Sequence, residues 1–160
     1  MSKPGWYDRG IVKKLLAALD FSEVTEKVVS QAASLAEAFS AELTLIHVAA
    51  PNPDFVGYEA GPDTERDARA HELRDEHRKL QEIAEGLRRR GITARALLIQ
   101  GPTVEKILDE ARQLGAGAIV IGSHGRGALH RALLGSVSEG VVRGATCPVH
   151  VVPSRACPGG

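Results

Sequence analysis

The residues best suited to chemistry are the glycines and serines between positions 122 and 138. Gly122 and Gly125 are separated by two residues, and nine more separate Gly125 from Gly135, which Ser136 follows directly. An apolar run precedes the first glycine, and a helical pattern follows the last one. A buried strand, a glycine loop and a helix N-terminus together present backbone N–H groups to an anion. The pattern therefore predicts a phosphate site, and with it a nucleotide ligand.

The glycines and serines of this pattern have distinct expected roles in binding phosphate. We expect Gly122 to leave the strand at backbone angles closed to other residues, and Gly125 and Gly135 to permit positive φ and close approach to a ligand. Ser136 and Ser138 supply hydroxyl groups, beside helical N–H groups that have no intrahelical acceptor. In the competing interpretation these glycines only serve tight turns. The serine and the flanking strand and helix favour the phosphate site.

The same loop carries little that would drive a reaction. No lysine follows the glycines, so the GxxxxGK[ST] pattern of P-loop proteins is absent, and no base is placed for an attacking water. His124 lies inside the loop, where a histidine more often positions a ligand or sits at the surface than catalyses. His71 and His77 do not share a helix face at i,i+4 spacing, so no metal site is predicted.

The elements that must position this loop alternate along the chain. Apolar residues that recur with a period of 3.6 predict helices, and short apolar runs predict strands; glycines and prolines separate them. The predicted order of elements is β-α-β-α-β-α-β-α-β. Such an α/β string demands one open, five-stranded parallel sheet with helices on both faces, and we expect the strand order 3-2-1-4-5. The expected strands are 11–19, 42–49, 92–99, 117–121 and 148–152, and the expected helices are 22–39, 63–90, 103–114 and 136–143.

Local signals mark where the helices begin and end. Ser22 is expected to be the N-cap of the first helix, and Gly91 to end the long second helix at its C′ position. Gly115 is expected to end the third helix. Residues 50–62 contain three prolines and two glycines and are expected to form a long loop.

The predicted strand order also brings a carboxylate to the loop. Open parallel sheets bind ligands beyond the carboxyl ends of their strands, where the strand order reverses. Asp20 follows the first strand and Gly122 the fourth, so both should flank one crevice if those strands are neighbours. Asp20 also suits a helix-capping role, and the two roles are compatible.

Composition limits the functional class. The chain has 160 residues, 43% of them hydrophobic and 25% charged, which suits one globular domain. Twenty basic and twenty acidic residues balance, so a broad nucleic-acid surface is not expected. The sequence contains no run of eighteen apolar residues, so no membrane-spanning helix is expected. The N-terminus lacks the apolar core of a signal peptide. Cys147 and Cys157 have no metal-ligand spacing and suggest reduced thiols in the cytoplasm.

These motifs resemble the universal stress protein family, in its single-domain, ATP-binding form. The family signature is Gly, two residues, Gly, nine residues, Gly, then Ser or Thr, and Gly122, Gly125, Gly135 and Ser136 match it. Further likeness lies in ALDFSE, LTLIHV, AIVIGSHGRG and CPVHVV, at residues 18–23, 43–48, 118–127 and 147–152. The resemblance implies a family domain over 11–153, with an extension at 1–10, a flexible tail at 154–160 and a Rossmann-like fold of the adenine nucleotide alpha hydrolase type.

The resemblance also implies a ligand and a set of contacts. ATP, ADP or AMP would bind, with Mg²⁺ or Mn²⁺ as a companion of the phosphates. Asp20 would lie by the nucleoside and the Val48 backbone would contact adenine. The phosphates would be held by the remaining residues of the set, namely Gly122, Gly125, Gly135, Ser136, Val137 and Ser138.

The function implied by this likeness is regulatory. Family members commonly dimerise through the final strand, here 148–152, so a homodimeric stress-response module that senses adenine nucleotide is expected. Two alternatives stay open. The same pocket could serve a weak ATPase or phosphotransferase, or the chain could be a nucleotide-free interaction protein.

Overall fold

The computed structural model describes residues 12–49, 63–124 and 134–154, except for the side chains of 63–66. The predicted segments 1–10 and 50–62, Gly125 and most of the tail lie outside these ranges. Strands and helices alternate as the sequence predicts, with the bounds β1 Lys14–Ala18, α1 Thr25–Phe39, β2 Glu42–Ala49, α2 Asp63–Arg89, β3 Ala94–Gln100, α3 Thr103–Leu114, β4 Ala118–Gly122, α4 Ser136–Gly144 and β5 Val149–Val152.

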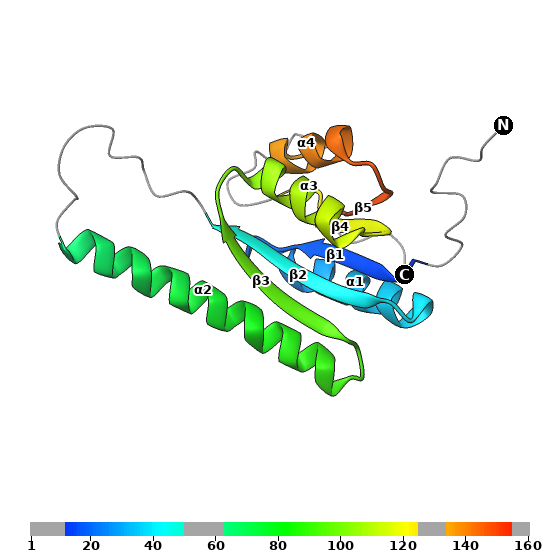
Figure 1. Ribbon diagram of the computed structural model, residues 1–160, viewed down its shortest axis with the longest axis horizontal. Coiled ribbons are helices and arrows are strands. Elements are labelled where there is room, and N and C mark those ends of the chain that lie inside the picture. Colours follow the sequence, from blue (N-terminus) through cyan, green and yellow to red (C-terminus); the bar gives the residue numbers. More distant parts are fainter. Residues whose placement is uncertain (1–11, 50–62, 125–133, 155–160) are drawn as a thin grey trace.

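The strands form one parallel sheet in the order β3-β2-β1-β4-β5, which confirms the predicted topology (Figure 1). β1 lies at the centre, and its last residue, Ala18, is opposite Ile46 of β2 and Ile121 of β4. β2 continues beyond that point along β3, as far as the pairing of Ala49 with Gln100. The central strand is therefore shorter at its carboxyl end than its neighbour β2.

Alternating side chains bury both faces of the sheet. Leu15, Ala17 and Leu19 belong to the core shared with α1 and α2, whereas Leu16 belongs to the core shared with α3 and α4. This period of two is the pleat of a strand covered on both faces. Each fully buried leucine or isoleucine contributes about 1.5–3 kcal/mol of hydrophobic stabilisation. The largest fully buried side chains are Leu15, Leu16, Leu43, Leu45, Ile46, Leu80, Ile119, Val120 and Val141.

The start of α1 differs from the prediction. The helix begins at Thr25, and the residue at its N-cap is Val24 rather than Ser22. The Asp20 carboxylate accepts a 3.0 Å hydrogen bond from the Ser22 amide, and Phe21 takes a positive φ of 57°. The chain therefore makes a separate turn after β1 before the helix begins. Ser22 belongs to this turn, where its hydroxyl lies 3.4 Å from the Val24 amide.

The predicted ends of α2 and α3 are confirmed. Gly91 follows α2 with a φ of 85°, and Gly115 is the C-cap of α3 with a φ of 62°. The Gly115 amide donates to the carbonyls of Ala111 and Arg112, which closes the last turn. Glycine is the residue that adopts this left-handed geometry at least cost.

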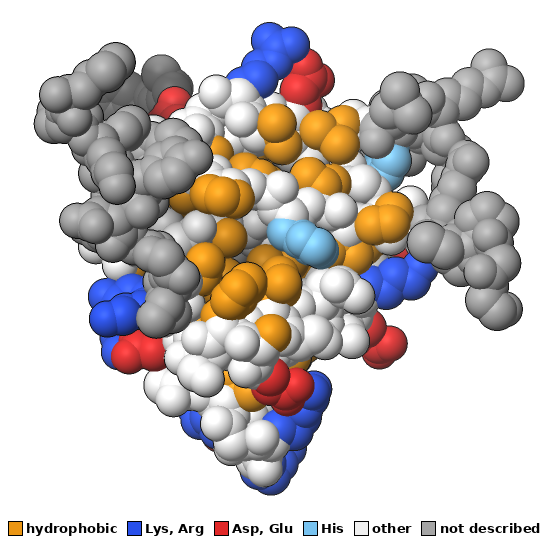
Figure 2. Space-filling model, turned by 90° about the vertical axis from the view of Figure 1, so that its right-hand side faces the viewer, with side chains coloured by type: hydrophobic (Ala, Val, Ile, Leu, Met, Phe, Trp, Pro, Cys, Tyr) orange, Lys and Arg blue, Asp and Glu red, His pale blue; other side chains and the backbone are white. Residues whose placement is uncertain are grey.

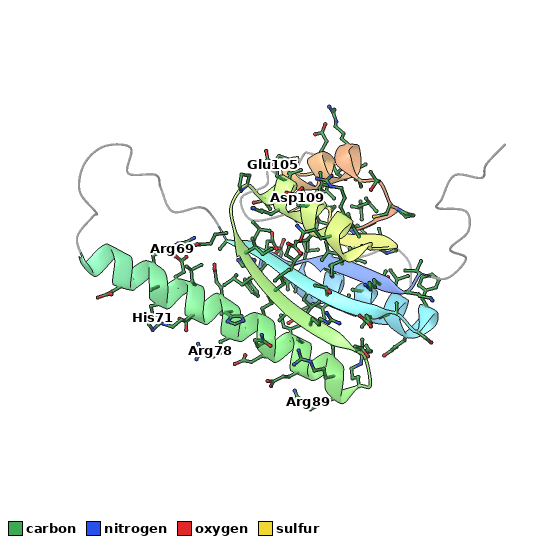
Figure 3. All side chains as sticks on the ribbon, in the orientation of Figure 1. Arg69, His71, Arg78, Arg89, Glu105 and Asp109 are labelled. Carbon is green, nitrogen blue, oxygen red and sulfur yellow. The ribbon has the colours of Figure 1, made fainter. Side chains whose placement is uncertain are left out.

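Charged side chains cover the outer surface of α2, the longest helix at 27 residues (Figure 3). Arg78 pairs with Asp75 at 2.9 Å, and Arg69 pairs with Glu72 at 2.5 Å. Exposed pairs of this kind add only about 0.2–0.5 kcal/mol each. Within the described ranges, no helix combines the length and apolar character that crossing a membrane requires.

Candidate nucleotide-binding site

Three adjacent strands bring the predicted residues to one end of the sheet. β2, β1 and β4 are neighbours and run parallel, so their carboxyl ends lie together. Val48 lies near the end of β2, Asp20 follows β1, and Gly122 is the last residue of β4. The expected adjacency of the first and fourth strands is therefore confirmed. The chain leaves β1 toward β2 on one side and returns to β4 on the other, which is the topological switch point where such sheets bind ligands.

The backbone of Val48 faces the space beyond the end of β1. The Leu19 amide donates to the Ile46 carbonyl at 2.8 Å, so the peptide groups of Ile46 point toward β1. Along a strand, the peptide groups of successive residues point alternately to the two neighbouring strands. The peptide groups of Val48, two residues after Ile46, therefore also point to the β1 side. β1 ends at Ala18, opposite Ile46. A ligand placed beyond β1 could therefore exchange hydrogen bonds with the main chain of Val48.

Asp20 lies two residues beyond the end of β1 and is half-buried. One of its carboxylate oxygens accepts the Ser22 amide at 3.0 Å, so the side chain organises the turn that leads to α1. This is the capping role anticipated for it, displaced to the turn before the helix. The position next to the β1 end keeps the ligand role available, since a carboxylate has several acceptor sites.

Gly122 is needed because a side chain would not fit here, and not because of its backbone angle. Its φ is not among the positive values of the described glycines, so the expected special turn is wrong here. A Cβ at this position would lie 3.2 Å from Val24 Cγ1, 3.4 Å from the His124 carbonyl oxygen and 3.5 Å from Val28 Cγ2. The glycine therefore allows α1 to approach the end of β4 closely.

The two ends of the loop between β4 and α4 are joined at its base. The Gly135 amide donates a 2.7 Å hydrogen bond to the Ser123 carbonyl. Gly135 has φ −72° and ψ 160°, a conformation open to any residue, so the positive φ expected for it is also wrong. Its own amide is engaged by Ser123, which leaves the following amides as the candidates for an anion. Gly125 falls outside the described residues.

α4 begins directly at this junction. Its N-cap is Gly135, and the Glu139 amide makes a bond of 2.9 Å to the Gly135 carbonyl. The N–H groups of Ser136, Val137 and Ser138 precede that bond and have no intrahelical acceptor. These three amides lie where the helix carries its partial positive charge. The arrangement can hold a phosphoryl group.

The two serines of this turn differ in their surroundings. Ser136 is exposed, whereas Ser138 is 3% exposed and its hydroxyl donates to the Gly122 carbonyl at 2.6 Å. Ser138 therefore ties α4 to the end of β4, and its side chain already has a partner. Ser136 is the serine whose hydroxyl stays open to solvent or to a ligand.

Ser123 was missed by sequence reasoning, although it organises the base of the loop. Its amide donates to the Val152 carbonyl at 2.8 Å, and its hydroxyl oxygen accepts the Ser154 amide at 3.2 Å. His124 Nδ1 lies 3.0 Å from the same oxygen. A small hydroxyl residue directly after the strand, between Gly122 and Gly125, was the available signal. The chain after β5 is thereby connected to the site.

Comparison with known proteins gives a consistent result. The model of the universal stress protein family matches residues 12–153. The universal stress protein YxiE of Bacillus subtilis is 33% identical over 144 residues, which is 87% of this chain and 97% of YxiE.

Two solved structures share the fold. The structure of MJ0577 from Methanocaldococcus jannaschii superposes with a TM-score of 0.78 at 27% identity, over 91% of this chain and 99% of that one. A universal stress protein from Archaeoglobus fulgidus in complex with dAMP has a TM-score of 0.60 at 23% identity, over 89% of this chain and 98% of that one. The family match spans every described strand and helix, and on this basis the chain belongs to the universal stress protein family.

Proposed function

We propose that this protein binds an adenine nucleotide at the carboxyl ends of β2, β1 and β4 and acts as a regulatory binding module. The observation that carries the proposal is the convergence of two backbone features. The α4 N-terminus offers the amides of Ser136, Val137 and Ser138, and the main chain of Val48 faces the space beyond β1. One end of the space therefore suits phosphate and the other suits a base edge.

The phosphate half of the proposed site is preorganised. The bond from Gly135 to Ser123 fixes the loop ends, and the bond from Ser138 to Gly122 fixes α4 against β4. Donors held in place before binding lose little further conformational entropy when the ligand arrives. In the proposal Gly125 completes the loop, as the family signature implies.

The nucleoside half relies on Asp20 and Val48. Val48 would contact adenine through its main chain, and Asp20 would lie by the nucleoside. Support comes from the A. fulgidus protein of the same fold, whose structure is a complex with dAMP. Main-chain donors and acceptors distinguish adenine from guanine because the two bases present different groups on their edges.

A divalent cation in this site would arrive with the phosphates. Within the described ranges, no group of three or more His, Cys, Asp or Glu side chains could hold a metal ion by itself. Mg²⁺ is commonly held by one or two protein groups together with substrate phosphates. The described residues therefore fit a cation bound mainly by the nucleotide, and Mg²⁺ or Mn²⁺ would neutralise phosphate charge there.

Homodimer formation through residues 148–152 is part of the proposal. The carbonyls of Pro148 and Val152 accept bonds from Ile119 of β4 and from Ser123 directly after it, so the peptide groups of Val149 and Val151 point to the outer edge of the described sheet. An unpaired edge is a template for pairing with another chain. The face shown in Figure 2 carries hydrophobic side chains gathered around a histidine, as interaction surfaces often do.

The proposed setting is the cytoplasm. Cys147 is a free, half-buried thiol, and burial raises its pKa above the ordinary value. A thiol with a raised pKa stays protonated and unreactive at neutral pH. Such a group suits a reducing compartment.

Calorimetric titration with ATP, AMP and GTP tests the nucleotide proposal, together with mass spectrometry of nucleotide released from the purified protein. We expect adenine nucleotides to bind and GTP to bind at least about tenfold more weakly, the equivalent of one lost hydrogen-bond pair. The proposal fails if no adenine nucleotide is recovered and ATP gives no binding heat.

Timed phosphate release with Mg²⁺ then separates a binding module from an enzyme. We expect turnover far below about 10 per second, the median for enzymes. A rate near that median would instead support the ATPase alternative.

A further inference from the structure

The backbone directly after Asp20 is strained. Phe21 has a φ of 57°, and a bulky residue in the left-handed region is uncommon because its Cβ crowds the backbone. Such strain persists only where surrounding contacts hold it, and it gathers at functional sites. The contacts that hold Phe21 are therefore candidates for a role in the site.

The ring of His47 makes one of these contacts. His47 lies on β2 directly before Val48 and is 7% exposed. Its ring centroid is 4.5 Å from that of Phe21, with the planes tilted by 44°. Its Nδ1 lies 2.7 Å from the Leu19 carbonyl oxygen. Because a carbonyl can only accept, Nδ1 carries the hydrogen. One side chain thus contacts both residues that flank Asp20.

The hydrogen bond to Leu19 also affects the backbone of Val48. In a continued parallel ladder, the Leu19 carbonyl would accept the amide of the residue two places beyond Ile46, which is Val48. The hydrogen bond recorded at this carbonyl comes from the His47 ring instead. Among the described residues, the Leu19 carbonyl accepts the His47 ring and makes no ladder bond with the Val48 amide, so that amide is available to a ligand.

A contact from α2 closes the other side of the ring. Glu76 Oε2 lies 3.5 Å from His47 Nε2, which is longer than a hydrogen bond, and Lys79 Nζ lies 5.8 Å from the centre of the Phe21 ring. Neither His47 Nε2 nor Glu76 Oε2 has a hydrogen-bond partner in the described residues. The bond to Leu19 is thus the contact that anchors the ring.

We infer that His47 is a positioning residue for the nucleoside half of the site, an inference that rests on the proposed nucleotide binding. The imidazole holds the turn at Asp20 and Phe21 and ends the hydrogen-bond ladder between β1 and β2. It does not itself touch the nucleotide. Its effect is to leave the Val48 amide facing the space beyond β1, next to the turn that carries Asp20.

Substitutions that separate the two ring nitrogens test this inference. His47→Asn places an amide nitrogen near the position of Nδ1 and can still donate to Leu19, whereas His47→Gln places it near Nε2. His47→Phe keeps a ring but removes both nitrogens. Leu43→Val is the matched control, because Leu43 is a fully buried residue of β2 at the opposite end of the strand.

Two probes distinguish positioning from simple core packing. Calorimetry with ATP should show about tenfold weaker binding for His47→Phe and His47→Gln, the effect of one lost hydrogen bond. His47→Asn should stay within about threefold of the unmodified protein. Inorganic tripolyphosphate, which tests the α4 end alone, should bind all three variants and Leu43→Val equally well.

The outcomes are separable. Unchanged ATP affinity in His47→Phe, or equal losses for ATP and tripolyphosphate, would overturn the positioning role while leaving nucleotide binding intact. An unmodified protein that binds neither probe would overturn the proposed function, and this inference with it. If His47→Phe does not fold, the comparison of His47→Asn with His47→Gln decides the matter.

Discussion

The Ser123 carbonyl oxygen accepts a 2.7 Å hydrogen bond from the Gly135 amide, so the loop that follows β4 returns to its own starting point before α4 begins. This contact fixes where the helix N-terminus lies relative to the end of the sheet. The amides of Ser136 to Ser138 follow immediately and are therefore placed by the sheet rather than by the loop. Predictions about the phosphate half of the site depend on this junction.

The two serines at the start of α4 should respond differently to alanine. Ser138→Ala removes the 2.6 Å bond to the Gly122 carbonyl in a buried setting, so unfolding free energy should fall by about 1–3 kcal/mol. Ser136→Ala should change stability by less than about 0.5 kcal/mol, because its side chain is exposed, but should weaken ATP binding. Urea unfolding and calorimetry measure the two effects. Equal stability losses in both variants would contradict the distinction.

Gly135→Val should abolish nucleotide binding without unfolding the protein. The φ of −72° and ψ of 160° are open to valine, so the side chain acts by blocking the approach of a phosphate to α4. Gly115→Val is the contrasting variant, since its φ of 62° strains any residue with a Cβ. Gly115→Val should lower the melting temperature while the folded fraction keeps its affinity. Normal ATP binding by Gly135→Val would remove this residue from the site.

Gly140→Ala should destabilise the protein by about 1–3 kcal/mol through overpacking. A Cβ there would lie 2.9 Å and 3.1 Å from the two methyl carbons of Val104, so α4 would have to move away from α3. ATP affinity should fall as well, because the N-terminus of α4 would shift. Gly86→Ala on α2 is the control: among the described residues its Cβ would meet Arg89 Nη2 alone, at 3.8 Å, and the variant should gain about 0.5–1 kcal/mol of stability.

Val151→Pro should convert the proposed homodimer to a monomer. The Val151 peptide points to the free edge of the sheet, so proline removes an outward N–H and leaves the pairing of β5 with β4 in place. Light scattering after size-exclusion chromatography measures the mass, and circular dichroism checks that the fold is kept. A folded variant that remains dimeric would place the interface elsewhere.

The alternation of strands and helices was predictable because each element carries its own apolar period. The alternation is compatible with more than one parallel strand order; the expected order 3-2-1-4-5 is confirmed, and it places Asp20 beside the end of β4. Gly135 and Ser136 could be assigned to the start of α4 because the signature and the helical pattern meet there.

The details that sequence could not supply depend on contacts between distant residues. Ser123 and Ser154 are 31 residues apart, and His47 and Leu19 are 28 apart. Phe21 could not be foreseen in the left-handed region, because local preference opposes it and only the folded surroundings sustain it. Ser22 suited an N-cap by residue type, yet the nearby Asp20 carboxylate forms a turn first.

The early end of β1 at Ala18 has an evolutionary consequence. If a ligand forms hydrogen bonds with the peptide groups of Val48, its binding does not depend on which apolar side chain this position carries. The side chain at position 48 can therefore be replaced by others that pack equally well against the sheet. The path of the backbone, rather than this side chain, determines which ligand binds. Selection for binding should then act on the geometry of the strand ends more strongly than on the residue that occupies this place.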